Sequence, residues 1–87
     1  MEQSENTTNV VFRKYKDGEI IALFPNDYYY SEEDKDTISS YMHIGQHSGA
    51  SYTHVIKTTK PALEDEYKDL YNELLNIGYN LNVKLKR

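Results

Sequence analysis

The stretch from Pro61 to Gly78 carries the most restrictive pattern in the chain. Its apolar residues recur at helical spacing and form one stripe, made of Leu63, Tyr67, Leu70, Tyr71, Leu74 and Ile77. Pro61 suits the first turn of a helix and pushes the residue before it out of helical backbone. Acidic residues at 64–66 lie where the helix dipole favours anions, and Gly78 can adopt the positive φ that ends a helix. The pattern predicts an amphipathic helix with one buried face.

Two runs rich in β-branched and aromatic residues stand near the start of the chain. Asn9–Tyr15 and Glu19–Phe24 are predicted strands. Between them, Asp17-Gly18 is a strong hairpin signal because its positive-φ positions suit a type I′ turn. Both faces of the second strand are apolar, which predicts a central place in the sheet. Pro25 is expected to end this strand because it cannot donate to the ladder.

The rest of the chain gives weaker patterns. Thr37–Gly45 alternates apolar and polar residues and predicts a half-buried strand. Asn26–Asp36 is charged and without periodicity, which is typical of a loop, and Gln46–Ser51 is Gly/Ser-rich and predicts a turn. Tyr52–Thr58 fits a short strand, a helical turn or an extended connection. Tyr79–Leu85 alternates again and predicts a final strand with one buried face.

The order strand, strand, strand, helix, strand predicts an α+β fold. We expect a small, mainly antiparallel sheet with one amphipathic helix packed on one face. At 87 residues the chain is one small domain. Residues 9–87 form this domain in our interpretation, and the polar residues 1–8 form a disordered tail.

Composition narrows the cellular setting. The chain has no cysteine, so disulfides and thiolate zinc sites are excluded and a reducing compartment is favoured. The first residues lack the apolar core of a secretory signal, and no apolar run approaches the ~20 residues of a membrane helix. We therefore expect a cytoplasmic protein without a membrane contact.

Charge argues against nucleic-acid binding as the main role. The formal net charge is −4, and acidic residues gather in residues 27–36 and 64–73, whereas phosphate contact depends on clustered Lys and Arg. Two nucleic-acid-linked alternatives stay open. In the first, Glu32–Asp36 is an acidic mimic of phosphate. A basic face would form if the first and last strands were neighbours, from Arg13, Lys14, Lys84 and Lys86.

The segment Tyr41–His54 contains all three histidines, His43, His47 and His54. In a strand, four residues span ~13 Å, too far for two imidazoles to share one zinc ion without a sharp bend. We therefore predict no metal site.

Ser48 stands beside His47, which raises the question of hydrolytic catalysis. A Ser–His pair also requires an orienting acid and an oxyanion hole, and the sequence shows neither. The surrounding small residues lack the P-loop and GxGxxG spacings. A hydrolase acting through His43, His47 and Ser48 is therefore the weakest alternative, and no cofactor is expected.

Three adjacent tyrosines, Tyr28-Tyr29-Tyr30, precede the acidic run. Neighbours in an extended segment point to opposite sides, so at least one ring should be exposed. An exposed tyrosine beside acids is typical of a partner-binding surface.

Three blocks of sequence carry a resemblance that covers nearly all of residues 10–87. They are VVFRKYKDGEIIALFP, SYMHIGQHS and TKPALEDEYKDLYNELLNIGYNL, with the loop 26–37 as the divergent part. In these blocks the chain resembles small uncharacterised proteins of gut bacteria, their phages and mobile elements. The resemblance implies no activity, cofactor or catalytic residue. It implies a genomic setting in which small accessory proteins often bind host or element-encoded macromolecules.

Taken together, these patterns favour a non-catalytic binding module. Its predicted contact residues are Tyr28, Tyr29, Tyr30, Tyr41, His43, His47 and Ser48. The expected partner is another protein, and a homodimer through an edge strand is a further expectation because so small a sheet leaves edges open.

Overall fold

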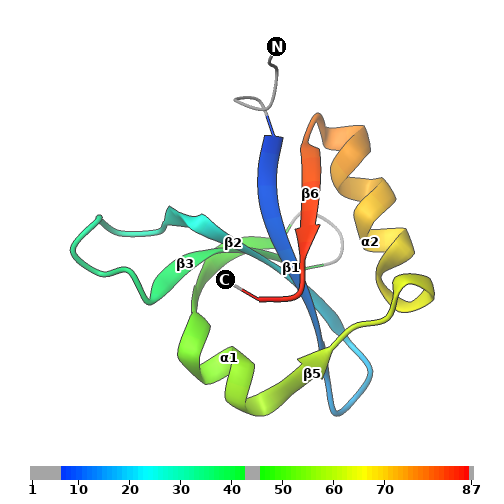
Figure 1. The fold of residues 1–87 in the computed structure, drawn as a ribbon, viewed down its shortest axis with the longest axis horizontal. Helices are drawn as coiled ribbons and strands as arrows, with labels where there is room; N and C mark the ends of the chain where they lie inside the picture. Colours follow the sequence, from blue (N-terminus) through cyan, green and yellow to red (C-terminus); the bar gives the residue numbers. More distant parts are fainter. Residues whose placement is uncertain (1–6, 43–45, 87) are drawn as a thin grey trace.

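The computed structural model describes residues 7–42 and 46–86. The elements within them are β1 (Thr7–Tyr15), β2 (Ile20–Tyr28), β3 (Thr37–Met42), β4 (Gln46–Ser51), α1 (Tyr52–Thr58), β5 (Thr59–Pro61), α2 (Glu64–Ile77) and β6 (Asn80–Lys84) (Figure 1). The predicted α+β class and the mainly antiparallel sheet are confirmed. Over residues 7–42 and 46–86 the structure has six strands and two helices, where the sequence predicted four strands and one helix.

The strands follow the order β4-β3-β2-β1-β5, and β6 also pairs with β1. β2 therefore has a partner on each side, which confirms its central place. The other edge of β1 is divided between two strands. Residues 7–11 pair in parallel with β6, and residues 13–15 pair antiparallel with β5 (Figure 1). The parallel pairing of the last strand was not predicted.

The hairpin between β1 and β2 is confirmed, but its loop has three residues. The N–H of Gly18 donates to the carbonyl of Tyr15 (2.9 Å), and the N–H of Tyr15 donates to the carbonyl of Glu19 (2.8 Å). Gly18 adopts a φ of 95°. These features are typical of a tight turn followed by a glycine bulge, whereas a type I′ turn has a two-residue loop.

β2 continues through Pro25 to Tyr28, so the prediction that Pro25 ends the strand is wrong. The register with β3 shifts between Phe24, opposite Ser39, and Tyr28, opposite Ile38. Pro25 lies inside this irregularity, where a missing N–H costs no ladder hydrogen bond.

The Gly/Ser-rich segment predicted as a turn is strand β4. It pairs with β3 in continuous register from Met42 opposite Gln46 to Thr37 opposite Ser51. The following segment, which the sequence left open, is helix α1. Its N-cap is Ser51, whose hydroxyl accepts the N–H of His54 (3.2 Å).

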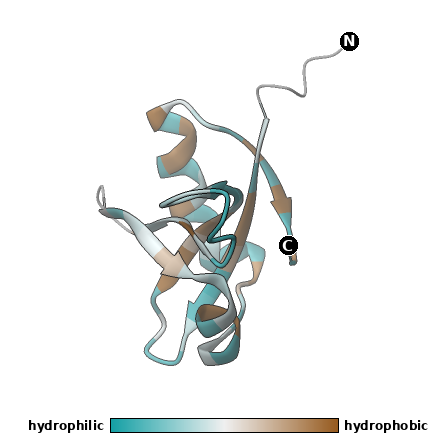
Figure 2. Cartoon of the chain, turned by 90° about the vertical axis from the view of Figure 1, so that its left-hand side faces the viewer, coloured by the Kyte–Doolittle hydropathy of each residue, from teal (hydrophilic) through white to brown (hydrophobic). Residues whose placement is uncertain are grey.

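Both faces of the sheet are covered. On the α2 face the buried residues are Val10, Phe12, Ala22, Phe24, Tyr41, Ala62, Leu70 and Leu74. On the opposite face, with α1, they are Val11, Ile21, Leu23, Ile38 and Val55. Figure 2 shows apolar residues along the strands and on both helices. The packing expected from the sequence is therefore confirmed only in part: α2 covers one face as predicted, and α1 adds a second, smaller cover on the other face.

Helix α2 is confirmed with a shorter start. It begins at Glu64, and Pro61 ends β5. Leu70 and Leu74 are buried and the two tyrosines of the stripe are half-buried, but Leu63 and Ile77 are exposed. Gly78 has a φ of 126° and ends the helix as predicted.

The described part of the domain starts at Thr7, two residues before its predicted boundary. The rest of the predicted tail, residues 1–6, lies outside the described residues. Neither α1 nor α2, the two helices that the structure describes, has the length and apolar character needed to cross a membrane.

Candidate protein-binding surface

Strand β4 places His47 on the same face of the sheet as α2. Directly opposed residues of an antiparallel pair share a face, and His47 is opposite Tyr41. The two rings meet edge to face, with centroids 4.5 Å apart and planes inclined by 62°. His47 itself is exposed. The buried ring of Tyr41 thus supports the exposed ring of His47 from beneath.

Tyr79, the residue directly before β6, flanks the same histidine. Its ring stacks on Phe24, with centroids 5.3 Å apart and an 11° angle between the planes. Its hydroxyl lies 3.4 Å from Nε2 of His47. Because Phe24 belongs to the core, this stack fixes Tyr79 beside the histidine.

Tyr29 and Tyr30 extend this surface along β4. The ring of Tyr29 packs against Gly49, which alternation places on the same face as His47. The rings of Tyr29 and Tyr30 meet at right angles, with centroids 5.0 Å apart. Tyr29 is 47 % exposed and Tyr30 is 75 % exposed. We call Tyr29, Tyr30, His47 and Tyr79 the aromatic surface.

Only three of the seven predicted contact residues, Tyr29, Tyr30 and His47, join the aromatic surface. Tyr41 lies beneath it, 1 % exposed, with its hydroxyl bonded to Glu73 of α2. A side chain so deeply buried offers no contact area, so the structure removes Tyr41 from the predicted contact set.

The other predicted contacts lie elsewhere. Tyr28 packs half-buried in the core on the α1 face. Ser48 also faces that side, where its carbonyl accepts the hydroxyl of Ser40 (2.9 Å). His43 lies outside the described residues. The sequence did not point to Tyr79, because no local pattern indicates that it would meet His47, 32 residues away.

The alternation of side chains along β4 argues against a hydrolase that uses His47 and Ser48. His47 and Ser48 are consecutive residues of a strand and point to opposite faces, so they do not form the hydrogen-bonded pair that activates a serine. Within the described residues, no three His, Cys, Asp or Glu side chains are grouped so as to hold a metal ion.

Two carboxylates of the acidic run accept hydrogen bonds from neighbouring parts of the protein. Oδ1 of Asp36 accepts the N–H (3.0 Å) and the hydroxyl (2.6 Å) of Thr53, and Oδ2 accepts the hydroxyl of Ser51. Oδ1 of Asp34 accepts the N–H of Thr37 (3.2 Å). Asp36 thus holds the loop against the start of α1, and Asp34 ties it to the start of β3, which gives both carboxylates a structural role.

The predicted basic face does not form as expected. Arg13 is 8 % exposed and donates to the hydroxyl of Thr59 (2.9 Å), the carbonyl of Thr59 (2.8 Å) and the carbonyl of Ile56 (3.2 Å). Burial lowers the pKa of its guanidinium. This arginine therefore joins β1 to the end of α1 and is not available to a phosphate backbone.

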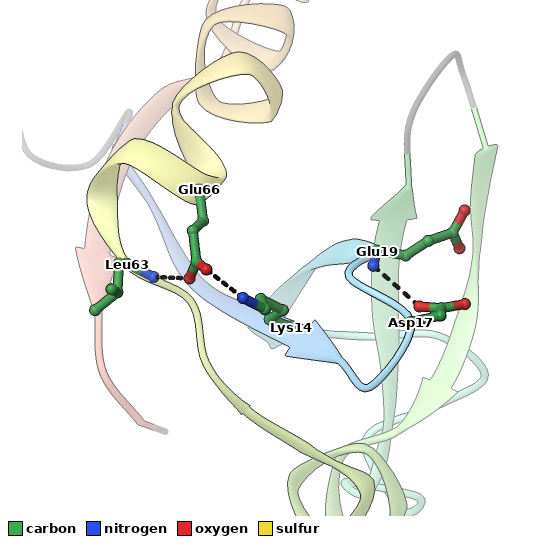
Figure 3. Close-up of polar contacts among 5 residues, drawn as sticks. All are labelled: Lys14, Asp17, Glu19, Leu63 and Glu66. Carbon is green, nitrogen blue, oxygen red and sulfur yellow. Dashed lines mark hydrogen bonds and ion pairs between the residues drawn. The ribbon is translucent and has the colours of Figure 1, made fainter.

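Lys14 and Lys84 lie on opposite faces of the sheet. Lys14 forms an ion pair with Glu66 of α2, which also accepts the N–H of Leu63 (2.8 Å) (Figure 3). Lys84 is in register with Val11, whose side chain lies on the α1 face. The first and last strands are neighbours, but their basic residues do not form one patch.

A comparison with known protein families, curated proteins and solved structures finds no match to this chain. What the aromatic surface offers a partner is therefore inferred from its own chemistry.

Proposed function

We propose that this protein is a small non-catalytic binding module that takes up an extended segment of a partner protein along β4. The observation that carries the proposal is the position of β4 at the end of the sheet. In the described part of the chain, β4 pairs with β3 alone. Its outer edge therefore presents backbone N–H and C=O groups on which another strand can add.

The side chains beside this edge suit recognition. Main-chain pairing supplies affinity in such complexes, and pockets or surfaces for alternate side chains supply specificity. The aromatic surface lies on one face of β4, and tyrosine contributes large contact area at a low cost in conformational entropy. A partner strand would place every second side chain against His47 and Tyr29.

The proposed setting is the cytoplasm of a bacterium that carries a phage or mobile element, with a partner encoded by the host or by the element. This part of the proposal is supported by the sequence resemblance.

Peptides selected from a random display library supply a probe for the proposal. Binding of such a peptide should shift the amide NMR signals of residues 46–51 and slow their hydrogen exchange, because the outer amides become paired. Tyr30→Ala should weaken binding by about tenfold, as expected for loss of an aromatic contact. Tyr28→Phe, on the other face, is the matched control and should bind normally. Signals that move only outside β4 and the aromatic surface would disprove this mode of binding.

Two alternatives give different outcomes in solution. Self-pairing of β4 would make a homodimer, whose mass in light scattering rises with protein concentration and whose β4 amides are protected without peptide. Direct nucleic-acid binding would appear as a mobility shift that weakens strongly with salt. Either outcome in the absence of peptide binding would replace the proposed function.

A further inference from the structure

Four lysines converge at the end of the sheet far from the acidic loop. Lys14 and Lys60 are partners in the β1–β5 register, Lys16 opens the hairpin, and Lys57 lies in the last turn of α1. Together with Tyr15 they line a cleft of about 460 Å³. Lysines from segments that are far apart in the sequence thus surround one cleft with positive charge.

This clustering is notable in a chain of net charge −4. Lys14 is neutralised by Glu66. Lys16, Lys57 and Lys60 are exposed, and none of them makes an ion pair within the residues that the structure describes, although the charge of Lys60 also helps to lower the pKa of Glu66. A cleft lined by one sign of charge concentrates the potential and attracts ions of the opposite sign.

A second cleft, of about 660 Å³, adjoins the first and shares Tyr15 and Lys57 with it. Its wall adds the apolar side chain of Met42 and the carboxylates of Asp17 and Glu19. Asp17 is held in place because its Oδ1 accepts the N–H of Glu19 (3.0 Å) (Figure 3). The second cleft thus offers an aromatic ring, an apolar contact and hydrogen-bond acceptors.

Tyr15 stands where the two clefts join. Burial raises the pKa of its phenol, and the charges of Asp17 and Glu19 raise it further. The hydroxyl therefore stays protonated at neutral pH and can donate a hydrogen bond. Each cleft falls within the roughly 300–1,000 Å³ of small-molecule sites.

We propose that the joined clefts bind a phosphorylated small molecule of nucleotide size. Its phosphates lie among Lys16, Lys57 and Lys60, its ring packs on Tyr15 and Met42, and its hydroxyls donate to Asp17 or Glu19. This inference is independent of strand addition at β4.

The surroundings favour a small ligand over a nucleic-acid strand. Asp17 and Glu19 lie on one side of the lysines, and the acidic first turn of α2 lies on the other, beside Lys14. A continuing phosphate backbone would bring its negative charges against these carboxylates, whereas a ligand that ends within the clefts keeps its phosphates among the lysines and meets Asp17 or Glu19 only through its hydroxyls.

ATP, inorganic pyrophosphate and adenosine are the probes, with the ¹⁵N-labelled full chain observed by NMR and calorimetry. ATP and pyrophosphate should shift the amide signals of residues 14–19 and 57–60, and adenosine alone should bind much more weakly. The double variant Lys57→Gln/Lys60→Gln should lower ATP affinity by at least about tenfold, since each charge-assisted hydrogen bond is strong. Lys84→Gln, at an exposed lysine of β6 that lines neither cleft, should leave it unchanged.

Glu66→Gln gives an independent check, because it frees Lys14 and should tighten pyrophosphate binding. The proposal is overturned if millimolar ATP and pyrophosphate leave residues 14–19 and 57–60 unmoved. It is also overturned if Lys84→Gln weakens binding as much as the cleft variant. Tighter binding of a single-stranded oligonucleotide than of ATP, through the same lysines, would reassign the site to nucleic acid.

Discussion

The ring of Tyr29 occupies the space that a side chain at Gly49 would need: a Cβ atom built at position 49 would lie 2.6 Å from Cδ2 of Tyr29. Gly49→Ala must therefore displace the tyrosine, and overpacking of this kind costs about 1–3 kcal/mol. We expect a loss of about 1 kcal/mol in urea unfolding, because Tyr29 is half exposed and can move. In a Tyr29→Ala background the same substitution should be neutral or stabilising, since alanine suits a strand better than glycine. An equal loss in both backgrounds would show that the ring is not the obstacle.

Arg13 should not tolerate lysine. Its guanidinium donates three hydrogen bonds to the end of α1 and the start of β5, and a lysine ammonium cannot reproduce this planar geometry. Arg13→Lys should lower the free energy of unfolding by about 2 kcal/mol, because buried acceptors lose their donors. Chemical denaturation measures this loss, and Lys16→Arg is the exposed control. A stability equal to that of the wild type would mean that these hydrogen bonds do not stabilise the fold.

The hydroxyl of Tyr41 joins the core to Glu73 of α2. Tyr41→Phe keeps the ring and removes that donor, and we expect a loss of about 1–2 kcal/mol. A double-mutant cycle with Glu73→Ala, which removes the acceptor, isolates the pair. The NMR signal of His47 should also move in Tyr41→Phe, because the two rings are in contact. Additive losses in the cycle would argue against the hydrogen bond.

Protonation of Glu66 should lower the free energy of unfolding at acid pH. Its pKa is lowered from the ordinary 4.5, first by the hydrogen bond from the N–H of Leu63 and then by Lys14. A carboxylate with a depressed folded-state pKa stabilises the fold above its unfolded-state pKa, and this contribution is lost as the pH falls through the folded-state value. Glu66→Gln should therefore flatten the decline in stability below pH 4.5. Urea melts across that range measure the effect, with Asp69→Asn as the exposed control on the same helix.

Gly78 ends α2 at a φ of 126°, while its N–H donates to the carbonyls of Leu74 (3.2 Å) and Leu75 (3.1 Å). A side chain at this φ is strained, so Gly78→Ala should cost about 1 kcal/mol. Thermal unfolding measures the loss. Asn76→Ala, at an exposed position of the same helix, should be neutral or slightly stabilising. A normal melting temperature for Gly78→Ala would mean that the helix end relaxes.

The sequence predicted those elements that are defined by local pattern. The stripe around Leu70 and Leu74 predicted α2, Gly78 predicted its end, and Asp17-Gly18 predicted the hairpin. In each case the signal lies within a few residues of the structure it specifies, as the helical period and the turn require.

The features that the sequence missed depend on distant partners. β4 is a strand although its composition suggests a turn, because it pairs along the whole of β3 and because Gly49 makes room for Tyr29. The parallel pairing of β6 with β1 likewise has no signal in the local sequence. For the aromatic surface, the sequence supplied Tyr29, Tyr30 and His47 but could not place Tyr79 beside them.

The divided edge of β1 has a consequence for synthesis of the protein. Asn9 of β1 accepts a hydrogen bond from Asn82 of β6, 73 residues later. As the chain leaves the ribosome, β2 can pair with β1 early, but residues 7–11 stay uncovered until β6 has also been made. An uncovered strand invites pairing with other chains. The nascent protein is therefore exposed to aggregation through this edge during the interval between the synthesis of β1 and that of β6, and a chain truncated before β6 would leave the edge open.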